Sequence, residues 1–403
     1  MGKKRILAID GNYMAMRALG SLNMGDRVNN LETKTEQESF IAGLNNQLVS
    51  LYTTFEPHID NIVFCTDNHS WRKDIEPYKP YHIADDKPLG YKENRKEKKE
   101  ESSINYDNFY KLYREFIETL KTKIIVFDIK GLEGDDLLMF MSGKIAELSD
   151  YEMITFCTDG DLVQIVKDNV FLMRNIKSKE APFGEYVINK KMYDKIYNQD
   201  AKSILLGNSL EANEYRQIFG LNIVGRDKVE RKLDSGISIA TPFKVALVKS
   251  ICGDKKDNLF SVMGWKSTTG TRDYKVTDTH LEKALGYYDL HLTEDTCKQI
   301  LMDKKLLTNL MITLRANCKQ SHIELKEIGQ HLKHNLRMNV LNRSNVPEQY
   351  AQEFDTMWEI LKEEVLSKFD SEILKSLKIN KTDSATNLLS ESIPDIHKIL
   401  IGQ

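Results

Sequence analysis

The chain is poor in the features of secreted and membrane proteins. Among its 403 residues, cysteine occurs only five times and proline only eight times. The cysteines are widely spaced and form no C-x-x-C pair, which argues against a zinc site and a disulfide framework. No apolar run approaches the roughly 20 residues of a membrane-spanning helix, and the run at 6–9 is too short for a signal peptide. These absences predict a cytoplasmic protein with reduced thiols and no membrane partner. We also expect a monomer.

An excess of positive charge is also absent. The chain carries 57 lysines and arginines against 60 acidic residues, a formal net charge of −3. This balance excludes a generally basic coat for nucleic acid, although it leaves local basic patches open. The length allows two or three domains with a large core.

Strand-like and helix-like segments alternate along the first 165 residues. Short apolar runs predict strands at 4–9, 61–65, 123–127 and 152–157. Apolar positions at helical spacing predict helices at 13–19, 36–55 and 106–120, one that opens at 131–136 and runs through 145, and another after residue 161. Such alternation is typical of an α/β fold with a mainly parallel central sheet and helices on both faces.

Carboxylates follow the ends of these predicted strands. They are Asp10, Asp67, the group Glu133, Asp135 and Asp136, and the pair Asp159 and Asp161. Each acid alone is explained equally well as a helix N-cap. Together they meet at one edge of a parallel sheet, where like charges raise one another's pKa. A divalent cation resolves this repulsion, and an all-oxygen donor set favours magnesium or manganese.

A second acidic motif lies more than ninety residues further on. It is the block 253–258, Gly-Asp-Lys-Lys-Asp-Asn, which contains Asp254 and Asp257. The apolar segment 243–251 before it predicts a buried helix. In isolation the block is better explained as a turn with solvated charges, so its metal-binding role depends on the other motifs.

The segment 68–101 has an unusual composition. It contains three prolines and several tyrosines, and it ends in a lysine- and arginine-rich run at 91–99. Taken alone, such a run is typical of an exposed charged loop.

The ordered set of motifs resembles the 5′-nuclease superfamily, the flap endonucleases and 5′→3′ exonucleases of bacteria and phages. The chain shows particular likeness to the ribonucleases H of T-even bacteriophages, through the block 253–258 and the Trp71-Arg72 pair. The resemblance covers residues 1–265. It implies a PIN-like nuclease domain that cuts phosphodiesters with two Mg²⁺ ions, for which Mn²⁺ substitutes.

The resemblance also assigns site residues. The metal ligands or their close neighbours would be Asp10, Asp67, Glu133, Asp135, Asp136, Asp159, Asp161, Asp254 and Asp257. Asp135, together with Lys92 and Arg95 as phosphate-gripping cations, would take part in catalysis. The DNA contacts would be Arg72, Lys79, Lys92, Arg95, Lys96, Lys266 and Arg272. About ten extra residues between Trp71 and Tyr91 leave Tyr78-Lys79 as a rival for the role of Tyr91-Lys92.

The domain organisation follows from the same comparison. We expect a nuclease domain at 1–265, with an arch-like basic segment at 68–101 and an insertion at 174–242. A helical C-terminal domain would occupy 266–403, with a long amphipathic helix at 350–378 that packs against the nuclease domain. The apolar tail 393–401 would dock on its own domain, or on a single-strand-binding protein or sliding clamp.

The expected function is that of a 5′→3′ exonuclease or 5′-flap endonuclease with ribonuclease H activity. Its substrates would be flap or forked DNA and RNA–DNA hybrids, and its task the removal of RNA primers in lagging-strand replication, in the host cytoplasm if the source is a virus. The alternatives are a PIN-type ribonuclease on free RNA and a catalytically inactive binder of branched DNA. A phospho-acceptor receiver domain also clusters acids at strand ends, but it needs none from a second region.

Overall fold

The computed structural model describes residues 3–25, 27–80, 83, 86–176, 184–192, 201–209, 212, 216, 241–266, 273–318, 323–370 and 372–375. The chain divides into two compact units. The first comprises Met1–His69, Glu101–Ile239 and Pro347–Gln403, and the second comprises Ser70–Glu100 and Ala240–Val346. Among the described residues, none of the helices is both long and apolar enough to span a membrane.

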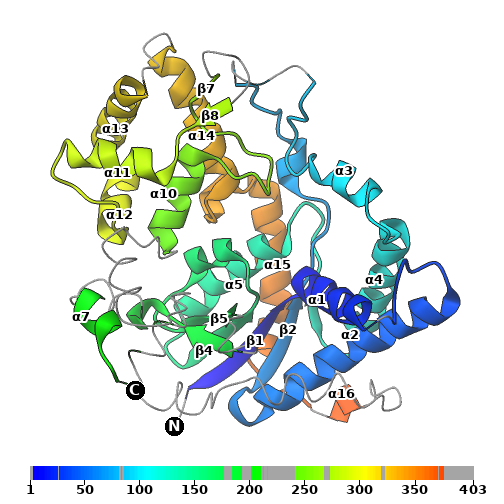
Figure 1. Ribbon diagram of the computed structural model, residues 1–403. Coiled ribbons are helices and arrows are strands. Elements are labelled where there is room, and N and C mark those ends of the chain that lie inside the picture. The colour runs from blue at the N-terminus through cyan, green and yellow to red at the C-terminus, as the bar shows by residue number, and fades with distance from the viewer. Residues whose placement is uncertain are drawn as a thin grey trace. The chain divides into compact units, whose positions relative to one another are not determined.

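A six-stranded sheet forms the centre of the first unit, in the order β3-β2-β1-β4-β5-β6. The strands are β1 Lys4–Asp10, β2 Asn61–Cys65, β3 Ile125–Phe127, β4 Tyr151–Phe156, β5 Val170–Ile176 and β6 Gly184–Ile188. Figure 1 shows β1, β2, β4 and β5 among their helices. The first five strands pair in parallel, and β6 pairs antiparallel to β5. The predicted α/β fold with a mainly parallel sheet is confirmed.

Helices cover both faces of this sheet because alternate side chains of each strand point to opposite faces. Leu7 and Ile9 of β1 belong to the apolar core shared with α1 (Gly11–Met24), α2 (Lys34–Phe55) and α4 (Tyr106–Lys121). On the other face, Cys65 Sγ lies 3.6 Å from Met141 Sδ of α5 (Gly134–Ala146).

The strand order reverses at β1. The chain builds β2 and β3 on one side of β1, and then crosses to place β4 and β5 on the other side. In open α/β sheets, the crevice beyond the carboxyl ends of the strands at such a reversal is where ligands bind. The reversal therefore directs attention to the residues that follow β1 and β4.

The helix α15 (Glu348–Val365) also packs on the first unit. Its Phe354 ring stacks on Phe127 of β3 and on Phe140 of α5, at centroid distances of 5.4 and 4.8 Å. At its carboxyl end, Asn61 Nδ2 donates to the carbonyl of Val365 at 3.0 Å. These contacts agree with the expectation that this amphipathic segment packs against the domain that contains the sheet.

The predicted domain boundary at 265 differs from the observed division. Pro347–Gln403 groups with the sheet, because α15 fills an apolar face of it, rather than with the helices that precede it. The basic segment Ser70–Glu100 groups with Ala240–Val346 instead of with the sheet. The segment predicted as one helix at 350–378 also ends earlier, at Val365, and a short helix α16 (Glu372–Lys375) follows.

The second unit is mainly helical around its own apolar core. Its helices are α3 Arg95–Glu100, α10 Pro242–Cys252, α11 Asp278–Gly286, α12 Glu294–Met302, α13 Lys304–Asn317 and α14 Leu325–Asn339. An antiparallel pair of strands, β7 Gly264–Lys266 and β8 Asp273–Lys275, lies between α10 and α11 in the chain. The shorter elements of the chain are η1 Glu56–His58, η2 Trp71–Asp74, η3 Gly160–Ile165, α7 Ala201–Leu206 and η4 Arg343–Asn345.

Three sequence predictions fall on parts of the chain that the structure leaves undescribed. They are the apolar tail at 393–401, most of the insertion at 174–242, and the phosphate contact at residue 272. The described parts of the insertion include the strand β6 and the helix α7.

Candidate metal centre

Asp10 is the last residue of β1 and the N-cap of α1. Its Oδ1 accepts a hydrogen bond from the Tyr13 N–H at 2.9 Å, and its Oδ2 accepts one from Cys157 Sγ at 2.9 Å. The residue is only 7% exposed. Burial raises the pKa of Asp10. The hydrogen bond from Cys157 opposes this rise, and the negative charge of Asp159 adds to it.

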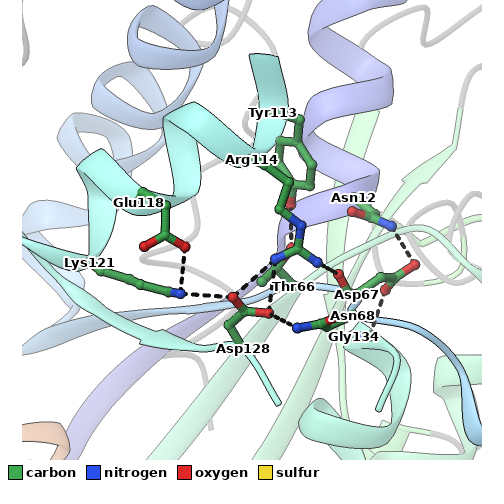
Figure 2. Close-up of polar contacts among 10 residues, drawn as sticks. All are labelled: Asn12, Thr66, Asp67, Asn68, Tyr113, Arg114, Glu118, Lys121, Asp128 and Gly134. Atoms are coloured by element: carbon green, nitrogen blue, oxygen red, sulfur yellow. Dashed lines mark hydrogen bonds and ion pairs between the residues drawn. The ribbon is translucent and has the colours of Figure 1, made fainter. Parts of the chain in front are cut away.

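Asp67 stands two residues after β2 and contacts the start of α5. The Gly134 N–H donates to Asp67 Oδ1 at 2.6 Å, and the Asn12 side-chain amide donates to Oδ2 (Figure 2). A Cβ atom at Gly134 would lie 3.2 Å from Asp67 Oδ1 and 3.5 Å from Asp10 Oδ1. Both carboxylates therefore lie against the first residue of α5, where the helix dipole favours negative charge.

The three acidic residues at the start of α5 have different local roles. Glu133 is the N-cap, and its N–H donates to Asp136 Oδ2 at 3.2 Å in a capping box. Asp136 is fully buried and its carboxylate stabilises the helix end, so of the two roles that the sequence resemblance allows, the position of a close neighbour of the metal ligands fits it better. Asp135 is half-buried. Burial raises the pKa of the Cys157 thiol, and the charges of Asp10 and then Asp135 add to this rise, which places Asp135 near Cys157.

Asp159 and Asp161 follow β4 at the turn into the 3₁₀ helix η3. Asp159 Oδ1 accepts from the Asp161 N–H at 3.0 Å and caps this helix, as the simpler interpretation of the pair expects. The Asp159 N–H donates to Cys157 Sγ at 3.3 Å. Asp159 remains exposed and Asp161 is half-buried.

The structure thus brings four predicted acids together where the strand order reverses. Asp10 and Asp67 both lie close to Gly134. Asp10, Asp135 and Asp159 all lie around Cys157. The Cys157 thiol donates its proton to Asp10 Oδ2 in a hydrogen bond, and the other donors of this group are carboxylate oxygens. Such a donor set fits hard divalent ions of the Mg²⁺ and Mn²⁺ class.

The second unit holds its two predicted acids in a tight loop after α10. Gly253 adopts a positive φ of 80°, and the backbone of Asp254 bridges to that of Leu259. Lys249 Nζ lies 2.5 Å from Asp254 Oδ2, and the Lys256 N–H donates to Oδ1 at 2.8 Å. Burial acts to raise the pKa of Asp254, but the hydrogen bond and charge of Lys249 outweigh it and lower that pKa.

The basic run is bound to the same loop. Arg95 donates from NH2 to Asp257 Oδ1 at 2.7 Å and from Nε to the Lys256 carbonyl at 3.1 Å. The Lys92 N–H donates to the Asp257 carbonyl at 3.0 Å. Arg95, a predicted phosphate contact, is therefore paired with a predicted metal ligand, although nearly half of its side chain stays exposed.

Arg72 has a structural role rather than the predicted DNA contact. It is only 3% exposed. Its guanidinium lies 4.6 Å from the ring centroid of Trp71 and 5.9 Å from that of Tyr91, and its Nε donates to the Met338 carbonyl at 3.0 Å. A side chain held in this way does not reach a phosphate in solvent.

The remaining predicted cations differ in their surroundings. Lys79 and Lys96 are exposed, and Lys92 Nζ lies 4.8 Å from the centroid of the Tyr91 ring. Tyr78, whose segment rivals Tyr91-Lys92, stacks on His331 at 4.5 Å. The side chain of Lys266 and all of Arg272 lie outside the described residues.

Two arginines near the acids were not predicted. Arg17 of α1 lies with its guanidinium 5.5 Å from the ring centroid of Phe156, the last residue of β4. Arg114 of α4 donates to the backbone carbonyl of Asp67 (Figure 2). For Arg17 a signal exists, because Tyr13 and Arg17 lie four residues apart on one helix face; for Arg114 the contact depends on the tertiary fold.

The sequence matches one protein-family model. Residues 5–196 match the 5′-3′ exonuclease, N-terminal resolvase-like domain. A segment of 111 residues is 30% identical to the ribonuclease H of Enterobacteria phage T4 and covers 26% of this chain and 32% of that protein. The chain therefore spans about a third of the length of this curated relative.

Two solved structures resemble the chain weakly. The bacteriophage T5 flap endonuclease, in a pseudo-enzyme–product complex with DNA and metal ions, is 16% identical, with a TM-score of 0.45 over 92% of this chain and 100% of that chain. The T5 5′-exonuclease with divalent zinc ions is 16% identical, with a TM-score of 0.43 over 96% and 99% of the two chains. The site assignment therefore rests on the chain's own geometry and on the family match.

Proposed function

Because residues 5–196 match the 5′-3′ exonuclease, N-terminal resolvase-like domain, we propose that this chain is a member of the 5′-nuclease superfamily, a metal-dependent nuclease that hydrolyses phosphodiester bonds of DNA. The observation that carries the proposal is the convergence of Asp10, Asp67, Asp135 and Asp159 at the reversal of strand order. A converging set of carboxylates that includes a buried member with a raised pKa is typical of a functional site.

The four acids would hold the metal, and the protein fixes their orientations. The Tyr13 N–H and the Cys157 thiol hold Asp10, while the Gly134 N–H holds Asp67. When bound there, two Mg²⁺ ions would supply an activated water and stabilise the charge on the attacking and leaving oxygens. Carboxylates whose orientation is already fixed by hydrogen bonds need to reorient less during the reaction.

In the second unit, Asp254 and Asp257 would provide further metal ligands, and cations that are exposed or partly exposed would bind the DNA backbone. Lys79, Lys92, Arg95 and Lys96 are the described candidates. Contacts of this kind make binding depend on salt, because each neutralised phosphate releases counterions. Lys92 and Arg95 would also grip the phosphate near the reacting bond, as the sequence resemblance implies.

We further propose that the substrates are 5′-flap or forked DNA and RNA–DNA hybrids. The second is suggested by the likeness to a protein named ribonuclease H. Removal of RNA primers during lagging-strand replication, together with a single-strand-binding protein or sliding clamp, is the biological role that fits these substrates.

The test is a cleavage assay on a 5′-flap duplex, a 5′-RNA–DNA hybrid and free single-stranded RNA, each with Mg²⁺ and with EDTA. Wild type should cut the first two only with Mg²⁺, and Asp135→Asn should lose this activity while it retains DNA binding. Glu115→Gln, which removes an exposed acid of α4, is the matched control and should cut normally.

Two other outcomes would replace the proposal. Cutting of free RNA alone would identify a PIN-type ribonuclease. Tight binding of branched DNA without cutting in any divalent metal would identify a binding protein that has lost catalysis.

A further inference from the structure

Arg114 of α4 connects two groups that belong to different strand ends. Its NH2 donates to the backbone carbonyl of Asp67 at 2.5 Å, and its NH1 lies 3.0 Å from both carboxylate oxygens of Asp128 (Figure 2). Asp67 follows β2 and Asp128 follows β3. One guanidinium therefore joins a candidate metal ligand to a neighbouring strand end.

The surroundings of Asp128 favour an ionised carboxylate that binds this guanidinium. Its side chain is only 6% exposed, and it also accepts hydrogen bonds from Lys121 Nζ at 2.9 Å and from Asn68 Nδ2 at 3.0 Å. Burial acts to raise the pKa of Asp128, but the hydrogen bonds from Lys121 and Arg114 outweigh it and lower that pKa. The carboxylate is therefore ionised at neutral pH and holds the guanidinium through a charge-assisted contact.

The residues on either side of Asp67 are fixed as well. The Thr66 N–H donates to the carbonyl of Phe127 at 3.1 Å, and Thr66 Oγ1 lies 2.9 Å from the Tyr113 hydroxyl. The Asn68 N–H donates to the carbonyl of Leu132 at 3.0 Å. At Asp67 itself, the backbone carbonyl accepts a hydrogen bond from Arg114. The carboxylate accepts one from the Gly134 N–H at the start of α5.

A guanidinium beside a metal-binding carboxylate normally competes with the metal for it. In this structure the Arg114 contact goes to the carbonyl of Asp67, and Asp128 takes up the positive charge. The carboxylate oxygens of Asp67 contact Asn12 and Gly134, which are neutral donors. The arrangement thus fixes the peptide of Asp67 without an ion pair between Arg114 and the Asp67 carboxylate in the contacts described.

We propose that Arg114, held by Asp128, is a positioning residue that orients Asp67 for metal binding. This inference rests on the proposed function, in which Asp67 is a metal ligand. Replacing Arg114 removes the guanidinium that holds the Asp67 peptide, whereas replacing Asp128 frees this guanidinium to pair with the Asp67 carboxylate. Residues that orient metal ligands typically contribute about 10- to 100-fold to metal affinity or activity.

The test measures Mn²⁺ and Mg²⁺ binding by calorimetry without DNA, in wild type, Arg114→Lys, Asp128→Asn and Lys121→Gln. Lys121→Gln is the matched control. It removes the other cation that contacts Asp128 but leaves the link from Arg114 to Asp67 intact. We expect metal affinity to fall about 10-fold or more in the first two variants, and to change less than twofold in the control. The Mg²⁺ concentration for half-maximal cleavage should rise in parallel, while the KM for DNA at saturating Mg²⁺ stays near the wild-type value.

A double variant separates positioning from general loss of stability. If Arg114 and Asp128 act as one unit, Arg114→Lys combined with Asp128→Asn should lower metal affinity no further than either change alone. Thermal unfolding of each variant identifies any that fail to fold, and Arg114→Lys is the mildest of them.

The possible failures are distinguishable. If wild type binds and cuts with Mg²⁺ but Arg114→Lys and Asp128→Asn match the Lys121→Gln control, the positioning role is refuted and the proposed function stands. If wild type binds neither metal and does not cut, both the proposed function and the positioning role are refuted.

Discussion

Asp10 in the first unit and Asp254 in the second are buried to nearly the same extent, at 7% and 8% exposure. Their partners differ in charge. Asp10 accepts hydrogen bonds from the neutral Tyr13 N–H and Cys157 thiol, whereas Asp254 lies against the ammonium group of Lys249. Burial raises the pKa of Asp10, while Lys249 overcomes burial and lowers the pKa of Asp254. The cationic partner of Asp254 thus outweighs the effect of burial, whereas the neutral partners of Asp10 do not.

Asp67 and Asp257 repeat the contrast. The described contacts to the Asp67 carboxylate come from the neutral Asn12 amide and Gly134 N–H, whereas Asp257 is paired with Arg95. Under the proposed function, a metal ion would add positive charge beside the carboxylates of the first unit. The acids of the second unit already have cations, which a metal or a phosphate would have to exchange.

Removing a carboxylate from the first unit should have the largest effect. Asp10→Asn should lower Mg²⁺-dependent cleavage by roughly 100-fold or more, beyond the effect typical of residues that only orient ligands. Asparagine remains a good N-cap for α1, and the change removes a buried charge near Asp159. Thermal unfolding in EDTA should therefore occur at the wild-type temperature or above it.

Retention of more than a tenth of the wild-type cleavage rate would contradict this assignment of Asp10. A marked drop in unfolding temperature without metal would show instead that the carboxylate stabilises the fold, as the second unit's acids are expected to do. Glu115→Gln again serves as the exposed acidic control.

In the second unit, the two partners of one ion pair should affect DNA binding with opposite sign. Arg95→Gln should weaken binding of a flap duplex in EDTA severalfold, and reduce the dependence of log K on log salt by about one. Asp257→Asn should tighten binding, because it removes a negative charge and releases Arg95. Fluorescence anisotropy over a range of salt concentrations measures both, and equal weakening by the two variants would refute a DNA contact by Arg95.

The smallest expected effect concerns the pH dependence of stability. The pKa of Asp128 lies below its unfolded value of about 3.9. Its ionised form therefore stabilises the fold above about pH 4, and this stabilisation is lost as the pH falls through the folded pKa. Asp128→Asn should lower the free energy of unfolding at pH 7 by roughly 2 kcal/mol, and by less at pH 3.

Urea unfolding of wild type and Asp128→Asn at both pH values measures this difference. Asn108→Ala, a change elsewhere on α4, provides a control whose effect should not depend on pH over this range. An equal loss at pH 7 and pH 3 for Asp128→Asn would contradict the ionised, cation-paired state of Asp128.

The sequence predicted the sheet well where strands are short apolar runs. The strands β1, β2 and β4 match their predictions within one residue, since each is buried and bounded by polar residues. The third strand starts two residues later than predicted. The strand β5 was not predicted, because polar Arg174 and Asn175 interrupt its apolar pattern.

The candidate site was only partly predictable. Acids that follow predicted parallel strands can be recognised as site candidates from the sequence, because the carboxyl ends of parallel strands lie at the same edge of the sheet. The local role of Asp136 depends on capping geometry, and that of Arg72 on rings brought close by the fold. The packing of α15 on the sheet also depends on contacts between residues more than two hundred positions apart.

Calorimetric titration of the metal-free protein with Mn²⁺ tests the central claim most directly. The account predicts that wild type binds the ion, that Asp10→Asn and Asp159→Asn lose most of this affinity, and that Glu115→Gln binds like wild type. Binding of Mn²⁺ with unchanged affinity by Asp10→Asn and Asp159→Asn would contradict the account, because the metal would then lie away from the acids at the reversal of strand order.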